Sequence, residues 1–92
     1  MKQDLHNISE LEINKIKNIL SQVEVELYKA VISYKPFNSA HEGYAVILEE
    51  VDELWDEVKK KPSKVSDERM QKEAAQIAAM AVRFIHDSCR WK

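Results

Sequence analysis

Hydrophobic residues recur at intervals of three or four along three separate stretches of the chain. The first stretch opens with Ser9 and Glu12, whose spacing is that of a capping box. Its apolar positions are Ile13, Ile16, Leu20, Val23, Leu27, Ala30 and Tyr34. This alternation is typical of a helix packed nearly parallel or antiparallel to its partners. We therefore expect a helix over residues 9–34, ended by Pro36.

A second pattern begins at Ser39, which is followed three residues later by Glu42 in the same capping-box spacing. Its apolar positions are Tyr44, Ile47, Leu48, Val51, Leu54, Trp55 and Val58. They share a single helical face centred near Val51. Three consecutive lysines suit the exposed carbonyls of a last turn, and Pro62 follows them. The pattern predicts a helix over residues 39–61.

The third pattern follows Ser66, a suitable N-cap with two acidic residues after it. Its apolar positions are Met70, Ala74, Ile77, Ala81, Phe84 and Ile85. A helix over residues 66–89 is predicted. One glycine and two prolines leave little material for hairpins, so the fold class is all-α, a bundle of about three helices. We expect leftover apolar surface to pair with further copies of the chain as a dimer or tetramer.

Composition limits the size, the partners and the cellular location that we expect of this protein. Ninety-two residues make a single domain over residues 1–92, too short to be more than marginally stable alone. A net charge of -2 gives no reason to expect a nucleic-acid polymer as partner. Cys89 is the single cysteine, which favours a reducing compartment. The first ten residues lack the apolar core of a signal peptide, and no uncharged run is long enough to span a bilayer. We expect a cytoplasmic protein with no membrane partner.

The second predicted helix is strongly acidic. The stretch "HEGYAVILEEVDELWDEV", from His41 to Val58, holds seven carboxylates and no Lys or Arg. Glutamates four residues apart are adjacent like charges on a helix, and each such pair is destabilising by roughly 0.2–0.5 kcal/mol. One interpretation is an ordinary solvated face, with ion pairs four residues apart at its end. These pairs would be Asp56–Lys60 and Glu57–Lys61.

The acidic positions also lie beside the apolar faces. Glu50 and Glu53 fall on the same side of the face centred near Val51. On the third helix, Glu73 and Gln76 occupy one edge of the apolar face. Two packed helices bring such edges together and leave the carboxylates half sheltered from water. A divalent cation such as Mg²⁺, which takes oxygen ligands, relieves this crowding.

The same residues resemble a known motif pair. "EEVDEL", residues 49–54, and "EAAQI", residues 73–77, resemble the E-x-x-E and E-x-x-D motifs of the MazG-like all-α nucleoside triphosphate pyrophosphohydrolases. The stretch "HEGYAVILEEVDELWDEVKKK" is similar to small MazG-like proteins of phages and prophages. The resemblance covers residues 37–88 and implies an all-α fold of the NTP pyrophosphatase type.

The resemblance implies Mg²⁺-dependent hydrolysis of a (deoxy)nucleoside triphosphate to monophosphate and pyrophosphate, with Mn²⁺ as an alternative ion. Its catalytic residues would be Glu50, Glu53 and Glu73, and the metal ligands would be these three with Gln76. The final Asp of the second motif is replaced in this chain by Gln76, whose amide oxygen brings no negative charge. This departure predicts weaker metal binding, so a nucleotide- or metal-binding relative with weak or no catalysis is an alternative.

Three further residues are candidates for substrate binding. Arg83 lies two turns beyond Gln76 along the same edge, where it would contact phosphate or form a surface ion pair. His41 falls in the first turn of the second helix, and Lys61 belongs to the lysine cluster at its end. The alternative for these lysines is a solvated helix end. A different class of function, a structural oligomerisation module built on the first helix, also fits the pattern.

Overall fold

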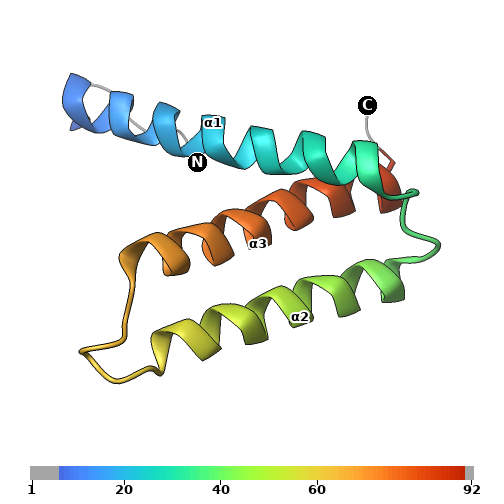
Figure 1. The fold of residues 1–92 in the computed structure, drawn as a ribbon. Coiled ribbons are helices and arrows are strands. Elements are labelled where there is room, and N and C mark those ends of the chain that lie inside the picture. The colour runs from blue at the N-terminus through green and yellow to red at the C-terminus, as the bar shows by residue number, and fades with distance from the viewer. Residues whose placement is uncertain (1–6, 91–92) are drawn as a thin grey trace.

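The computed structural model describes residues 7–90, which form three α-helices joined by short loops (Figure 1). The helices are α1 (Glu10–Ser33), α2 (Ala40–Val58) and α3 (Asp67–Ser88). No strand occurs in this range, which confirms the predicted all-α class. None of these helices combines the length and apolar character needed to cross a membrane. The signal-peptide expectation falls mostly on residues outside the described range.

Each helix begins at the serine predicted to cap it. The serine hydroxyl oxygen accepts a hydrogen bond from the backbone N–H three residues on, which is the expected capping geometry. These bonds run to Ser9 from Glu12 at 3.2 Å, to Ser39 from Glu42 at 3.1 Å, and to Ser66 from Arg69 at 3.2 Å. The start of each helix is therefore determined by an N-cap hydrogen bond between residues three positions apart.

The end of α2 differs from the prediction. The helix ends at Val58, three residues before the expected position. Pro62 has no N–H to donate and disfavours helical geometry at Lys61, so the last predicted turn does not form. Lys59 becomes the C-cap, with its N–H bonded to the carbonyl of Trp55 at 2.9 Å. The other two helices end within one residue of the predicted positions.

The ion pairs predicted at this end, Asp56–Lys60 and Glu57–Lys61, do not form, and the two acids pair with other lysines. Instead of pairs four residues apart, the structure has two pairs three residues apart. They join Asp56 to Lys59 at 3.1 Å and Glu57 to Lys60 at 2.9 Å. The shorter spacing follows from the early end of α2, which removes the next turn from the helix.

Helix α3 lies between the other two (Figure 1). It packs against both α1 and α2, whereas α1 and α2 do not pack against each other over residues 7–90. The buried core is small and consists of Val23, Ala30, Phe37, Ala75, Ala79 and Met80. No large side chain in the described range is fully buried. The three helices therefore form an open layer.

Helices α2 and α3 approach most tightly at Gly43. A Cβ atom at this position would lie 2.7 Å from Cδ2 of Phe84 and 3.0 Å from Cδ2 of Phe37. Real Cβ atoms are essentially never found so close to a neighbour. The glycine therefore permits the close approach of α2 to α3 at this crossing.

The side of α2 that packs on the core is not the one predicted. Gly43, Val46 and Ile47 face the core, but Val51, the predicted centre of the apolar face, is 41% exposed. The difference arises because Glu50 and not Val51 lies on the side toward α3. Five apolar residues of α2 thus remain exposed: Tyr44, Leu48, Val51, Trp55 and Val58.

Candidate metal centre

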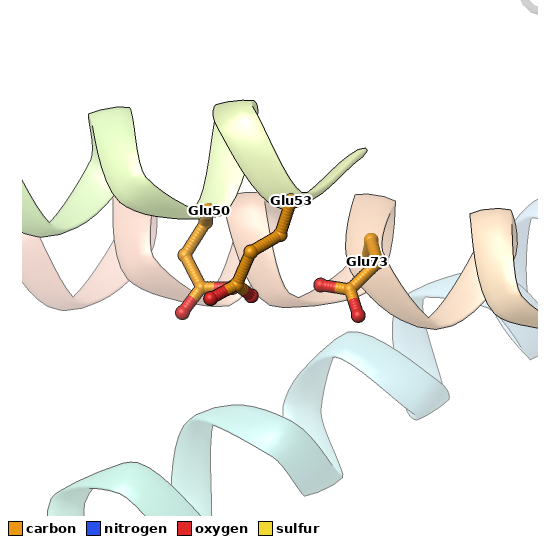
Figure 2. Close-up of side chains that lie close together, drawn as sticks. All are labelled: Glu50, Glu53 and Glu73. Carbon is orange, nitrogen blue, oxygen red and sulfur yellow. The ribbon is translucent and has the colours of Figure 1, made fainter. Parts of the chain in front are cut away.

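Three carboxylates from two helices converge on one side of the layer. Glu50 and Glu53 lie one turn apart on α2, and Glu73 approaches them from α3 (Figure 2). Each residue offers one carboxylate oxygen, and these oxygens all lie within 4.8 Å of one another. The packing of α2 on α3 thus brings together the three glutamates that the sequence analysis singled out.

The electrostatics of the cluster are unfavourable for three bare charges. The pKa of Glu50 is raised to about 7, chiefly by burial and then by the neighbouring carboxylates of Glu53, Glu73 and Glu49. Burial also raises the pKa of Glu73, with Glu53 contributing through a hydrogen bond and its charge. Glu50 and Glu73 are therefore held where negative charge is poorly solvated and repelled by neighbouring carboxylates, whereas Glu53 is exposed.

Two oxygens of the cluster have no partner. The Oε2 atoms of Glu50 and Glu73 are buried and make no hydrogen bond. Buried polar atoms in proteins are nearly always satisfied, so such atoms call for an explanation. No lysine or arginine of residues 7–90 forms an ion pair with the three glutamates.

Glu57 provides a contrast one turn further along α2. Its carboxylate accepts hydrogen bonds from Lys60 at 2.9 Å and from Arg69 at 2.8 Å. The bond from Lys60, followed by that from Arg69, lowers the pKa of Glu57. Glu57 is therefore neutralised by ion pairs within the chain, whereas no ion pair neutralises the cluster.

This donor set fits a hard divalent cation. Mg²⁺ and Ca²⁺ bind carboxylate oxygens at roughly 2.0–2.6 Å, so opposite ligands of one ion lie roughly 4–5 Å apart. The three carboxylate oxygens of the cluster, which lie within 4.8 Å of one another, are spaced on this scale. The two unpartnered oxygens would gain the interaction that they lack. On these grounds the residues present fit such an ion.

A groove of about 450 Å³ opens beside the cluster. Its walls come from α1 and α2, which do not contact each other, and its floor comes from α3. Lys29, Ser33 and Tyr34 line the α1 side, and Glu49 and Glu50 line the α2 side. The volume is within the usual range for small-molecule sites. Because Glu50 belongs to both the groove lining and the carboxylate cluster, a molecule in the groove would lie against the carboxylates.

Gln76 is part of the groove floor. It lies on α3 one turn beyond Glu73 and lines the groove together with Glu50. Its side chain is partly buried. The residue predicted to complete the metal ligands therefore lines the groove one turn from Glu73, with an amide in place of a carboxylate.

Arg83 also lines the groove, but its guanidinium is already engaged. It is only 6% exposed, and its Nε lies 3.3 Å from Oδ2 of Asp87. The guanidinium carbon lies 4.0 Å from the ring centroid of Phe37, a cation–π contact. A second nitrogen donates to the carbonyl of Lys35. The structure therefore shows a buried ion pair rather than the surface pair considered from the sequence.

The other two predicted substrate-binding residues lie away from the groove. His41 is exposed in the first turn of α2, about 13 Å along the helix from Glu50 at 1.5 Å per residue. Lys61 is exposed beyond the end of α2, where its carbonyl accepts hydrogen bonds from the N–H groups of Lys64 and Val65. Neither residue lines the groove or belongs to the carboxylate cluster.

Several residues of the site were not predicted from the sequence. The α1 wall of the groove was missed because nothing in the pattern of that helix distinguishes Lys29 or Ser33 from other surface positions, and Tyr34 was assigned only to the apolar face. Asp87 carried a usable signal, since it follows Arg83 by four residues and such pairs meet on a helix. Phe37 comes from a loop 46 residues before Arg83, and no local spacing connects the two.

Fold and site together define an all-α protein in which two packed helices present a carboxylate cluster beside an open groove. No known family model matches the sequence, and no curated protein or solved structure matches it either.

Proposed function

We propose that the chain is a MazG-like nucleoside triphosphate pyrophosphohydrolase that uses Mg²⁺, with Mn²⁺ as the alternative ion. The observation that carries the proposal is the convergence of Glu50, Glu53 and Glu73, with two buried oxygens left unpartnered. A solvated acidic face does not require this arrangement. The motif resemblance assigns these same three residues.

The chain's own residues have distinct tasks in this reaction. Glu50, Glu53 and Glu73 hold the ion and thereby fix where the triphosphate lies. A bound divalent cation supplies charge stabilisation to the phosphates as the anhydride bond breaks. The adjoining groove accepts the nucleoside, with Tyr34 and Met80 offering apolar surface to the base. The substrate therefore spans the groove and the cluster.

Hydrolysis also needs a group to receive a proton from the attacking water. Glu50 is the best placed of the three glutamates, because it is the one that lines the groove in which the substrate would lie. Products are the nucleoside monophosphate and pyrophosphate.

Gln76 favours a second candidate within the same fold. An amide at this position lowers the negative charge facing the ion, so metal binding and turnover are both weaker while the groove for the nucleotide is kept. In this case the chain is a nucleotide-binding or regulatory relative of the enzymes. Both candidates use the same groove and the same three glutamates.

Pyrophosphate release from a panel of canonical and modified triphosphates, with Mg²⁺ or Mn²⁺, tests the enzyme. We expect release from at least one of them, and a loss of at least roughly 100-fold in Glu73→Gln, the scale of removing a catalytic group. Glu68→Gln, an exposed glutamate in the first turn of the same helix, is the matched control and should retain the rate.

If no triphosphate is hydrolysed, the enzymatic proposal is wrong. The second candidate then predicts that Mg²⁺ with a non-hydrolysable triphosphate raises the melting temperature of the chain, and that Glu73→Gln abolishes this rise. A melting temperature unaffected by metal and nucleotide would exclude both candidates.

A further inference from the structure

One side of α3 runs along the floor of the groove. Four of its residues, at spacings of three and four, line the groove: Gln76, Ala79, Met80 and Arg83. Arg83 lies ten residues beyond Glu73, about 15 Å along the helix at 1.5 Å per residue. The groove therefore has two ends of different chemistry, one beside the carboxylate cluster and the other at Arg83.

The guanidinium of Arg83 is buried but only partly satisfied. Its Nε pairs with Oδ2 of Asp87 at 3.3 Å, and Nη2 donates to the carbonyl of Lys35. The third nitrogen, Nη1, makes one hydrogen bond within residues 7–90, to the thioether sulfur of Met80 at 3.9 Å. A thioether is a weak acceptor. Because Arg83 is only 6% exposed, water does not readily take the place of a better partner.

The surroundings of Nη1 place it on the groove side and hold it there. Its contact, Met80, lines the groove floor, and Tyr34, whose ring centroid is 5.8 Å from the guanidinium carbon, lines the α1 wall. Phe37 lies against the guanidinium, and Asp87 and Lys35 bind two of its nitrogens. A ligand that binds Nη1 therefore does not have to order this side chain first.

A neutral acceptor suits this end of the groove better than a phosphate. The carboxylate of Asp87 already offsets the charge of Arg83. Tyr34 and Met80 offer apolar surface that a flat ring can cover. A ring carbonyl of a base meets both conditions, because its oxygen accepts from arginine as the O6 atom of guanine does. An amino group at the same ring position is a donor and would face Nη1 without forming a bond.

We propose that Arg83 determines which bases the groove accepts, with Nη1 donating to the carbonyl at position 6 of a purine or position 4 of a pyrimidine. The groove therefore prefers the keto bases guanine, hypoxanthine, uracil and thymine to the amino bases adenine and cytosine. This inference rests on the proposed function for the phosphates, which lie at the cluster end. It adds the class of base, which the three glutamates do not determine.

Binding of matched nucleotides tests the inference without any turnover. Inosine and adenosine triphosphates differ only at position 6 and the ring nitrogen beside it, and uridine and cytidine triphosphates differ in the same way at position 4. Isothermal titration calorimetry with their α,β-methylene analogues and Mg²⁺ gives each Kd. We expect each keto analogue to bind at least about tenfold more tightly than its amino counterpart, the scale of one hydrogen bond from a charged donor.

Two variants connect this preference to Arg83. Arg83→Lys keeps a cation beside Asp87 but has no Nη1, so the ratio of the two Kd values should fall below about twofold. Lys29→Gln changes a cation on the α1 wall of the same groove and should keep the parental ratio. A purely structural role of Arg83 would weaken both analogues alike. An unchanged ratio in Arg83→Lys would therefore overturn the proposal, as would its loss in Lys29→Gln.

The parent chain alone decides the outcome if Arg83→Lys fails to fold. Equal affinity for keto and amino analogues overturns the proposal, and so does the absence of binding by all four. A keto preference without pyrophosphate release from any triphosphate supports the base site and rejects the enzymatic function. Pyrophosphate release together with equal affinities does the reverse.

Discussion

Gln76 is the residue at which the site departs from the motif it resembles. It lies one turn beyond Glu73 and lines the groove with Glu50, so its amide oxygen can reach toward an ion without adding charge. Three glutamates already repel one another in the cluster. A fourth carboxylate would increase this repulsion in the absence of metal and increase the attraction for a cation in its presence.

We expect Gln76→Asp to tighten Mg²⁺ binding by roughly 1–2 kcal/mol, the scale of an added charged interaction. Isothermal titration calorimetry measures this affinity directly. Gln71→Asp, which adds the same charge five residues earlier on α3, should change the affinity little. Weaker Mg²⁺ binding in Gln76→Asp would show that position 76 does not face the ion, and the motif alignment would be wrong.

Individual residues were predictable where their role is local. Ser9, Ser39 and Ser66 cap their helices as expected, because an N-cap depends on a few neighbouring residues. The sequence predicted that Glu50 and Glu73 lie close together, both from their positions at the edges of two helix faces and from the motif resemblance. The structure brings them together. The engagement of Arg83 was not predictable, since two of its partners lie in a loop 46–48 residues earlier in the chain.

At the scale of elements, a polar cluster fastens the loop between α1 and α2 to the end of α3. Asp87 is 3% exposed in its side chain, pairs with Arg83, and accepts a hydrogen bond from the backbone N–H of Phe37 at 3.1 Å. Arg83 in turn donates to the carbonyl of Lys35 and lies over the ring of Phe37. These contacts hold the loop against the end of α3.

Removing one partner of this cluster should be costly. Arg83→Met removes the guanidinium from the buried carboxylate of Asp87, which keeps its contact with His86 Nδ1 at 2.7 Å. Breaking a buried pair in this way destabilises proteins by about 3–5 kcal/mol. Urea denaturation at fixed protein concentration gives the change in the free energy of unfolding. The double variant Arg83→Met/Asp87→Asn should recover part of the loss. A loss below about 1 kcal/mol in the single variant would show that solvent replaces the cation.

Periodicity located the helices but not the partner of each face. The apolar face predicted for α2 is centred near Val51, yet α3 packs on a neighbouring side that carries Gly43, Ile47 and Glu50. Hydrophobic spacing identifies a helix and its apolar face but does not say which side a neighbouring helix packs on. The early end of α2, by contrast, could have been predicted from the sequence, because Pro62 disfavours helical geometry at the residue before it.

At the scale of the whole molecule, the carboxylate cluster connects stability to pH. The folded chain holds the pKa of Glu50 at about 7, well above the ordinary 4.5, because burial disfavours its charge. Such a group stabilises the fold fully below its unfolded pKa, and this contribution is lost as pH rises through the folded value. Glu73 shifts in the same direction. The relevant window therefore runs from about pH 4.5 to 7.

In the presence of a chelator, we expect the free energy of unfolding to fall between about pH 5 and pH 7.5 by on the order of 1–2 kcal/mol through these groups. Glu50→Gln should reduce this fall, because an amide does not ionise. At the higher pH, Mg²⁺ at about 100 times its Kd should add about 2.7 kcal/mol to the parent. A pH dependence identical in parent and variant would contradict the assignment.

The loop between α2 and α3 has a consequence for insertions and deletions. Arg69 bonds to Glu57 at 2.8 Å and to the carbonyl of Lys64 at 2.7 Å, so the start of α3 is anchored to the end of α2 directly. Residues gained within the connecting segment would bulge outward and leave this anchor in place. One residue gained between Arg69 and Glu73 would instead turn that glutamate by about 100° around its helix. Length variation among natural variants should therefore be confined to residues 60–63.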